Sequence, residues 1–268
     1  MSVPRMILWL FGSVVALWLT LPVLVVIPVS LGDKPSFVFP ADDWSLRWYR
    51  NLVEDPAWSS AIWSSLKVAV VSATLATVLG TLAAIGLWRL RSRRITAMIQ
   101  GSLLLPLIVP EIVLAIGLYA IFLRAGLIGT VPGFVVAHAA MGLPYVVVAV
   151  MVSLNALDQA LLDAAGSLGA SPLQAWRGVG LPLISSGVVT GFLFAFVASF
   201  DNVVFSLFLK SPSLTTLPVQ MFSSLTRDTD PTIAAAATVV MTITVTLIVV
   251  GLSLLRRMRR LNDIKEVH

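Results

Sequence analysis

Three ionisable side chains, Lys67, Glu111 and Asp201, stand inside stretches of sequence that are otherwise apolar. A charged group at the centre of a bilayer costs about 2.5 to 3.5 kcal/mol by insertion scales, so such residues face a cavity or pair with another group. Two carboxylates beside one cavity bind a cationic solute through charge-assisted hydrogen bonds. The first chemistry that the sequence predicts is therefore recognition of a cation within the membrane.

The residues near both acids favour a cavity. Pro106 and Pro110 remove backbone donors just before Glu111, and irregular backbone at membrane depth is tolerated only where protein or water covers it. Phe200 precedes Asp201, and aromatic faces attract cations. The candidate solute path comprises Glu111, Asp201, Asn202, Phe200 and Tyr145. Because the chain has two His and no Cys residues, no metal site and no catalytic residues are predicted.

The sequence leaves two structural interpretations of these charges open. Lys67 can form an ion pair with either acid, or the acids can be protonated against neighbouring helices. Counted along straight helices at 1.5 Å per residue, Glu111 lies roughly 21 Å from Ala97 and Asp201 roughly 27 Å from Leu183. Both acids are therefore expected in the outer half of the membrane.

A second polar interruption, DAAGSLGASPLQAWRGVGLPLI, runs from Asp163 to Ile184. Within it, Ser171 can cap a new helix, Pro172 suits the first helical position, and Gln174 completes a capping box. Gly169 supplies the left-handed backbone that a sharp reversal needs. We therefore expect one helix that ends near Gly169 and a second, short helix that begins after the Ser-Pro step.

The second helix carries Leu173 and Trp176 next to Arg177. Exposed contiguous apolar residues generally mark interaction sites, which would make this segment a docking projection. Alternatively, the same side chains fold back onto the ends of the chain's own helices. The spacing alone does not choose between the two.

Composition places these residues in a membrane protein. The chain of 268 residues is 58% hydrophobic and 12% charged, with a mean hydropathy of +0.96, which lies outside the range of soluble globular domains. About 20 apolar residues cross a bilayer as a helix. Six such runs cover about residues 6–31, 62–87, 95–122, 131–154, 183–209 and 233–255. The expected fold is an all-α integral membrane protein with six transmembrane helices in a single domain over 1–268, with a loop at about 155–182.

The distribution of basic residues predicts the topology. The first apolar run is longer than the core of about 7 to 15 residues that a signal peptide needs, so we expect it to stay as a helix. Lys and Arg in short loops remain preferentially cytoplasmic. Eleven of these residues, including Arg91 and the cluster at 256–265, fall on one side of the membrane and six on the other. Both termini and the loop at 155–182 are therefore predicted to be cytoplasmic. The charge of +5 is explained by these helix ends, and we expect no nucleic-acid partner.

Amphipathic rings crowd the segment between the first two runs. They are Trp44, Trp48, Tyr49, Trp58 and Trp63. Such rings prefer the headgroup level, so we expect a short helix that lies on the outer membrane surface, with docking of an external partner as the alternative. His138, at the outer start of the fourth run, is also expected at the interface.

The polar interruption resembles the cytoplasmic EAA loop of permease subunits from ABC importers. That loop carries Glu-Ala-Ala, then a Gly, then Leu-Pro or Ile-Pro before the next helix. The matching residues are Asp163, Ala164, Ala165, Gly169, Ala170, Leu181 and Pro182, with Asp in place of Glu at the first position. Residues 44–89 and 200–223 resemble the spermidine/putrescine permease group.

The resemblance implies a type I ABC importer permease in the bacterial cytoplasmic (inner) membrane. The loop would be a coupling helix on a separate ATPase, with Asp163, Gly169, Trp176 and Arg177 in or near the contact. The implied partners are a second homologous permease, two ATP-binding subunits, an extracytoplasmic solute-binding protein and membrane lipid.

The resemblance also implies that this chain is no enzyme and binds no cofactor, because ATP and Mg²⁺ belong to the ATPase. The sequence contains no Gly-x-x-x-x-Gly-Lys-Ser/Thr loop, which agrees with that division. The implied solute is a polyamine such as spermidine or putrescine. The alternatives are another small solute, such as an amino-acid-like compound, an ion-coupled secondary transporter, or an intramembrane enzyme.

Overall fold

The computed structural model describes residues 3–34, 43–90, 92–227 and 230–265. Arg91, which contributed to the predicted topology, lies outside the described residues. Within these ranges the named elements are helices, and the β-structure is limited to two isolated bridges. The chain divides into two compact units, one from residues 1–60 and 220–243 and the other from residues 61–219 and 244–268.

Five helices in the described ranges are long and apolar enough to cross a membrane. The segments are Met6–Ser30 in α1 (Val3–Ser30), Pro56–Arg89 as α3, Val131–Asn155 as α6, Pro172–Phe200 ending in α9 (Leu181–Phe200), and Thr232–Arg256 in α12 (Thr232–Lys265). A sixth candidate is the bent pair α4 (Arg93–Ile108) and α5 (Glu111–Arg124). The predicted all-α membrane fold is confirmed.

The third predicted span is not one straight helix. The axes of α4 and α5 differ by 103°, with the bend at Val109 and Pro110. The residue before a proline disfavours helical backbone, and Val109 is accordingly extended (φ −75°, ψ 135°). The depth predicted for Glu111 was counted from Ala97 along α4, which runs unbroken to Ile108, so that depth stays a prediction. Glu111 is the first residue of α5.

The fifth predicted span is interrupted as well. Helix α9 ends at Phe200, and α10 (Val204–Leu209) begins after a break at residues 201–203. The side chain of Asn202 stabilises this break, because its Oδ1 accepts a hydrogen bond of 2.8 Å from Phe205 N. The acid and amide predicted for the solute path thus lie at a helix break.

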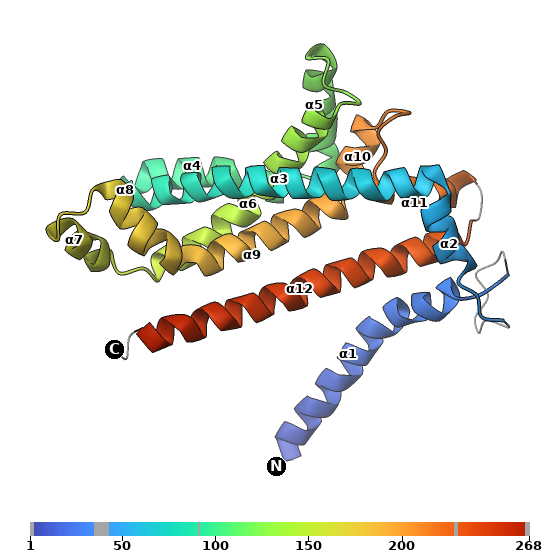
Figure 1. The fold of residues 1–268 in the computed structure, drawn as a ribbon, viewed down its shortest axis with the longest axis horizontal. Helices are drawn as coiled ribbons and strands as arrows, with labels where there is room; N and C mark the ends of the chain where they lie inside the picture. Colours follow the sequence, from blue (N-terminus) through green and yellow to red (C-terminus); the bar gives the residue numbers. More distant parts are fainter. Residues whose placement is uncertain (1–2, 35–42, 91, 228–229, 266–268) are drawn as a thin grey trace. The chain divides into compact units, whose positions relative to one another are not determined.

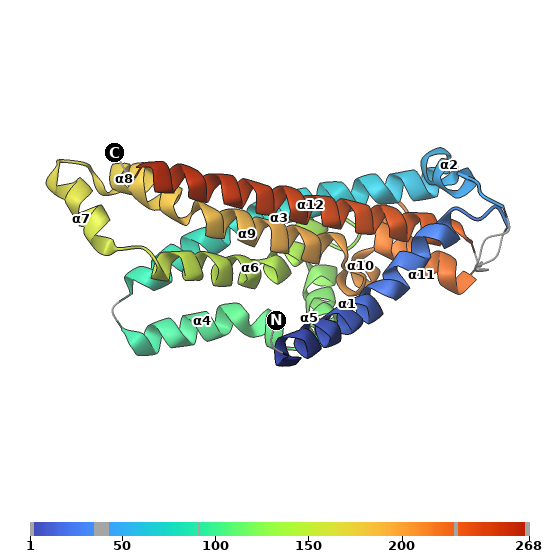
Figure 2. The same ribbon diagram turned by 90° about the horizontal axis from the view of Figure 1, so that it is seen from below.

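Small residues bring the central helices close together. Helices α6 and α9 lie side by side in both views of the ribbon, with α3 against them (Figures 1 and 2). A Cβ atom added to Gly191 of α9 would lie 2.9 Å from Cα of Val146 in α6, and one added to Gly80 of α3 would lie 2.8 Å from Cβ of Val146. Membrane helices pack through such small residues, so Val146 marks the centre of this bundle.

A separate hydrophobic cluster fixes α5 and α10 to the bundle. Its buried members are Val68, Ala115, Phe122, Phe134, Ala137, Phe205 and Leu209, from α3, α5, α6 and α10. This packing holds the start of α5 and the break after α9 against the same part of α6. It therefore positions Glu111 and Asn202.

The aromatic segment differs from its predicted role. It forms α2 (Arg47–Glu54) as expected, but Trp48 is buried and donates a hydrogen bond of 2.7 Å from Nε1 to Gly32 O. Trp58 is also buried, whereas Trp44 and Trp63 are exposed. Headgroup anchoring is thus wrong for Trp48 and Trp58, because their rings fill the interior of this part of the chain.

Candidate functional site

Both acids predicted for the solute path line one cavity. Its volume is about 570 Å³, and it lies where the bend between α4 and α5 meets the break between α9 and α10. The lining residues are Pro106, Leu107, Val109 and Glu111 from the bend, Met141 and Tyr145 from α6, Val197 and Ala198 from α9, and Asp201, Asn202, Val203, Val204 and Phe205 from the break and α10. We call this the acidic cavity.

Glu111 is oriented by the amide of Asn202. Asn202 Nδ2 donates to Glu111 Oε1 and, at 3.1 Å, to Met141 Sδ. Its Oδ1 accepts from Phe205 N, and the residue is only 7% exposed. The Asn202 amide is therefore committed to neighbouring groups. It positions the Glu111 carboxylate, which also lies at the favourable N-terminal end of α5.

Asp201 is the more accessible acid. It follows the last residue of α9, its backbone N–H donates to Val197 O at 3.1 Å, and the residue is exposed. In the part of the chain that the structure describes, no ion pair joins Lys67 to Asp201 or Glu111. The structure thus does not support the ion-pair alternative, and both carboxyl groups line the cavity.

One of the two predicted aromatic residues is misplaced. Tyr145 lines the acidic cavity, as expected. Phe200 does not: it is 1% exposed and stacks on Phe196 with ring centroids 5.5 Å apart. The helical turn that ends α9 directs Phe200 into the protein interior, and Phe205 of α10 lines the cavity but is itself only 2% exposed.

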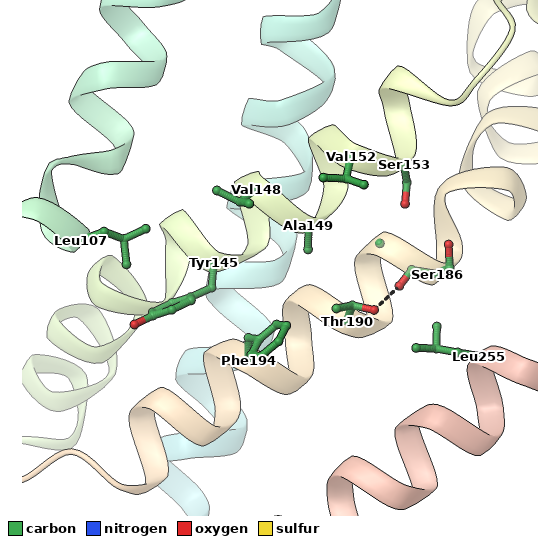
Figure 3. A pocket seen from close by; sticks show the side chains of 11 residues that line it. Leu107, Tyr145, Val148, Ala149, Val152, Ser153, Ser186, Thr190, Phe194 and Leu255 are labelled. Carbon is green, nitrogen blue, oxygen red and sulfur yellow. Dashed lines mark hydrogen bonds between the residues drawn. The ribbon is translucent and has the colours of Figure 1, made fainter. Parts of the chain in front are cut away.

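A second cavity, of about 410 Å³, lies along α6 and α9 (Figure 3). Leu107 and Tyr145 line both cavities. Its polar groups include the hydroxyls of Ser153, Ser186 and Thr190, and Thr190 Oγ1 donates to Ser186 O at 2.7 Å. Tyr145 thus stands at the junction of an acidic cavity and a largely apolar one.

The loop at 155–182 folds as its capping residues predict. Asp158 caps α7 (Gln159–Ser167), and Ser171 and Gln174 form the capping box of α8 (Pro172–Ala175), with Ser171 N 2.8 Å from Gln174 Oε1. Gly169 has φ +90°. Helices α7 and α8 lie together at one end of α6 and α9 (Figures 1 and 2).

Trp176 supports this loop from inside. It is 8% exposed, its ring centroid lies 6.1 Å from that of Trp88, and the Arg89 guanidinium lies 5.1 Å from its ring. A Cβ atom on Gly180 would collide with the Trp176 ring, so the π-helix at Trp176–Gly180 requires glycine there. Trp176 therefore folds back onto the end of α3, and its place in or near a partner contact stays a prediction.

The other predicted loop residues are accessible to different degrees. Asp163, Ala164, Gly169, Arg177, Leu181 and Pro182 are exposed, and Ala165 and Ala170 are partly buried. Leu168 is 89% exposed and Leu173 is also exposed. Asp163 lines a cleft of about 870 Å³ together with Arg89. The sequence analysis did not identify Trp88 and Arg89 as residues that support the loop. The available signal was a Trp-Arg pair at the end of an apolar run.

His138 occupies the interior rather than the membrane interface. It is 1% exposed, Nδ1 lies 2.9 Å from Ser199 Oγ, and Nε2 lies 3.3 Å from Ser206 Oγ. The predicted interfacial position is wrong because two serines on later helices supply the hydrogen bonds that water would give.

Comparison with known proteins gives one family and several relatives. The family described as "Binding-protein-dependent transport system inner membrane component" matches residues 76–260. The spermidine/putrescine transport system permease protein PotC of Haemophilus influenzae is 33% identical, over 92% of this chain and 95% of the relative. The putrescine transport system permease protein PotI of Escherichia coli K12 is 35% identical, over 74% and 73%. A molybdenum transport system permease protein, ModB of Mycobacterium bovis, is 31% identical, over 78% and 83%.

Solved structures support the fold. A bacterial ABC transporter involved in the import of the acidic polysaccharide alginate has a chain with TM-score 0.69 and 17% identity, covering 94% of this chain and 97% of that one. The methionine ABC transporter MetNI has a chain with TM-score 0.61 and 16% identity, covering 76% and 99%. Permeases for different solutes thus share this arrangement of helices.

Proposed function

This chain belongs to the family of binding-protein-dependent transport system inner membrane components, and from that premise we propose that it imports a polyamine such as spermidine or putrescine. Family membership makes it a permease subunit of an ABC importer in the inner membrane. It also favours ATP-driven import over the ion-coupled and enzymatic alternatives. What remains to be argued is the solute and the route by which ATP acts.

The acidic cavity carries the proposal for the solute. Glu111 and Asp201 line one cavity without an ion pair to Lys67 among the described residues, so their charges are available to a cation. Each ammonium group of a polyamine donates several hydrogen bonds, and bonds to carboxylates are roughly twice as strong as neutral ones. The aromatic face of Tyr145 adds cation–π attraction.

The fold itself does not choose the solute. A structural neighbour belongs to an importer of an acidic polysaccharide, and one relative is named for molybdenum transport. Two carboxylates in the cavity of this chain would repel an anion. The charge of the acidic cavity, together with the polyamine names of relatives that share up to 35% identity, therefore favours a cationic solute.

Coupling to ATP is assigned to the loop that contains α7 and α8. Leu168 and Leu173 expose apolar surface next to Gly169, and exposed apolar patches mark interaction sites. The sequence has no phosphate-binding Gly-x-x-x-x-Gly-Lys-Ser/Thr loop, so ATP and Mg²⁺ are expected on separate ATPase subunits. This loop would seat on such a subunit, with Trp176 holding it to the end of α3.

The remaining partners complete an importer. We expect a second, similar permease beside this chain, two ATP-binding subunits on the cytoplasmic side, where both termini are also expected, and an extracytoplasmic solute-binding protein. Closure of the ATPases would move α7 and α8 and shift the permeases between two openings of the solute path. Such coupling requires a two-state element that the partner biases.

Uptake in membrane vesicles tests the proposal. Vesicles would hold this chain with its candidate partner permease, ATPase and solute-binding protein, and ATP-dependent uptake of labelled putrescine and spermidine would be measured. We expect uptake that needs ATP and survives an ionophore that collapses ion gradients. ATP-dependent import of a different solute only would overturn the polyamine proposal, and uptake that follows the ion gradient would overturn the ATP-driven one.

A further inference from the structure

One imidazole bridges the two sides of the helix break that carries the acidic cavity. His138 of α6 bonds through Nδ1 to Ser199, in the last turn of α9, and through Nε2 to Ser206 of α10. The break at residues 201–203 lies between these two serines. A single side chain therefore ties the end of α9 to α10 across the interruption.

The hydrogen atoms of this network have one self-consistent direction. Ser72 Oγ lies 2.5 Å from Val68 O, so its hydroxyl donates to that carbonyl and accepts from Ser199 Oγ at 3.0 Å. Ser199 then has no hydrogen left for His138 and accepts from Nδ1–H. In a neutral ring the other nitrogen, Nε2, accepts from the Ser206 hydroxyl. Each of the three hydroxyl groups donates its hydrogen once, and the series of hydrogen bonds ends on the backbone carbonyl of Val68.

The same helix contacts the break at a third point. Met141 follows His138 by one turn of α6, and its sulfur accepts a hydrogen bond from Asn202, the residue that orients Glu111. The His138 ring also lies 6.5 Å, centroid to centroid, from the ring of Phe205, which lines the acidic cavity. The geometry of the cavity wall thus depends on how α6 holds the break.

We infer that His138 is a positioning residue for the acidic cavity: it fixes the break after α9 so that Asn202 meets Glu111 and Asp201 faces the cavity. This inference rests on the proposed function for its transport readout. His138 acts indirectly, because it lies in the interior and contacts the break through Ser199 and Ser206. An apolar residue in its place would leave buried hydroxyls without partners, which favours rearrangement of the break.

The test combines three substitutions with a readout that needs no transported solute. His138→Leu removes both hydrogen bonds, His138→Asn keeps a donor near the Nδ1 position, and His138→Gln keeps an acceptor near the Nε2 position. The chain has no cysteine, so a single Ala198→Cys reports on the wall of the acidic cavity alone. Its rate of reaction with a cationic methanethiosulfonate reagent is measured in detergent. Val152→Cys, about 21 Å along α6 from His138, is the matched control.

We expect His138→Leu to change the labelling rate at position 198 severalfold, to leave the rate at position 152 unchanged, and to raise the KM for putrescine about tenfold. His138→Asn and His138→Gln should each recover part of both effects. If the parent imports no polyamine but labelling at position 198 still responds to His138→Leu, the positioning role stands while the proposed solute fails. If the variants lose thermal stability while KM and labelling remain those of the parent, His138 is only a packing residue and the inference is wrong. Should His138→Leu not fold, Ser206→Ala replaces it with the same expected outcomes.

Discussion

Asn202 donates a hydrogen bond to the carboxylate of Glu111, a residue 91 positions earlier in the chain. The bond joins the break after α9 to the first turn of α5, so two interrupted helices present their polar residues to one cavity. Broken helices at membrane depth persist where the freed backbone lines a cavity or meets protein groups. The pair therefore links an irregular backbone to an acid that is available for binding.

Glu111→Gln separates the charge of this acid from its structural role. The glutamine oxygen still accepts the hydrogen bond from Asn202, but the negative charge is gone. We expect the KM for a polyamine to rise about tenfold or more, since a hydrogen bond to a charged group contributes about 1.5 to 3 kcal/mol. Asp201→Asn should act in the same direction. Initial rates of uptake in vesicles give the KM.

The control for the two acids is Lys67→Gln. Lys67 is exposed and does not line the acidic cavity. Removing its charge should leave the KM within the error of the parent value. A KM that falls strongly in Lys67→Gln would mean that the lysine neutralises the acids during transport, so that their charges are not freely available to a cation.

Gly169→Ala tests the reversal between α7 and α8. Gly169 has φ +90°, where a side chain is strained by roughly 1 kcal/mol or more, although a Cβ atom there meets no described atom within 4 Å. We expect the variant to weaken ATPase association while the chain stays folded. Gly166→Ala is the matched control, because Gly166 also has open space but is not among the described glycines with positive φ. Copurification with the ATPase measures the difference, and equal association of the two variants would count against the coupling role.

Substitutions at Trp176 and Leu173 should distinguish effects on the stability of the chain from effects on ATPase binding. Truncation of a buried Trp costs about 3 to 5 kcal/mol, so Trp176→Ala should lower the melting temperature in detergent. Trp176→Phe should cost much less, because Nε1 of Trp176 has no hydrogen-bond partner in the described structure. Leu173→Ser changes an exposed residue and should weaken ATPase binding without a change in melting temperature. A stable Trp176→Ala variant would contradict the packing of the Trp176 ring on the end of α3.

Gly191→Ala tests the close approach of α6 and α9. The new Cβ atom would lie 2.9 Å from Val146 Cα, and backbone cannot move aside as a flexible side chain can. Such overpacking typically costs about 1 to 3 kcal/mol, so we expect a lower melting temperature. Gly117→Ala in α5 is the control, since no described atom lies within 4 Å of its Cβ position. A Gly191→Ala variant as stable as the control would show that these helices are not in close contact.

The features that sequence predicts well are those set by local chemistry. Apolar runs of membrane length gave the long helices, since lipid requires their backbone groups to bond within the segment. Ser171, Pro172 and Gln174 act within one helical turn, so their capping box was visible in the sequence. Gly169 was recognised for the same reason, because its backbone conformation is a local property.

The features that sequence missed depend on distant partners. Pro106 and Pro110 indicated an irregular helix, but the 103° bend reflects packing of α5 against α10 as well. Hydropathy did not reveal that Phe200 turns inward and stacks on Phe196. His138 was misplaced because the serines that satisfy it lie 61 and 68 residues away. Such convergence is a property of the folded chain.

The most direct test of an importer with separate solute and coupling sites measures ATP hydrolysis and putrescine uptake in the same reconstituted vesicles. The parent complex is compared with Glu111→Gln and Gly169→Ala complexes. We predict that Glu111→Gln lowers uptake while the ATPase stays bound and active, and that Gly169→Ala weakens ATPase association and uptake together. Unchanged ATP-driven uptake in both variants would contradict the assignment of the acidic cavity to the solute and of the loop to the ATPase.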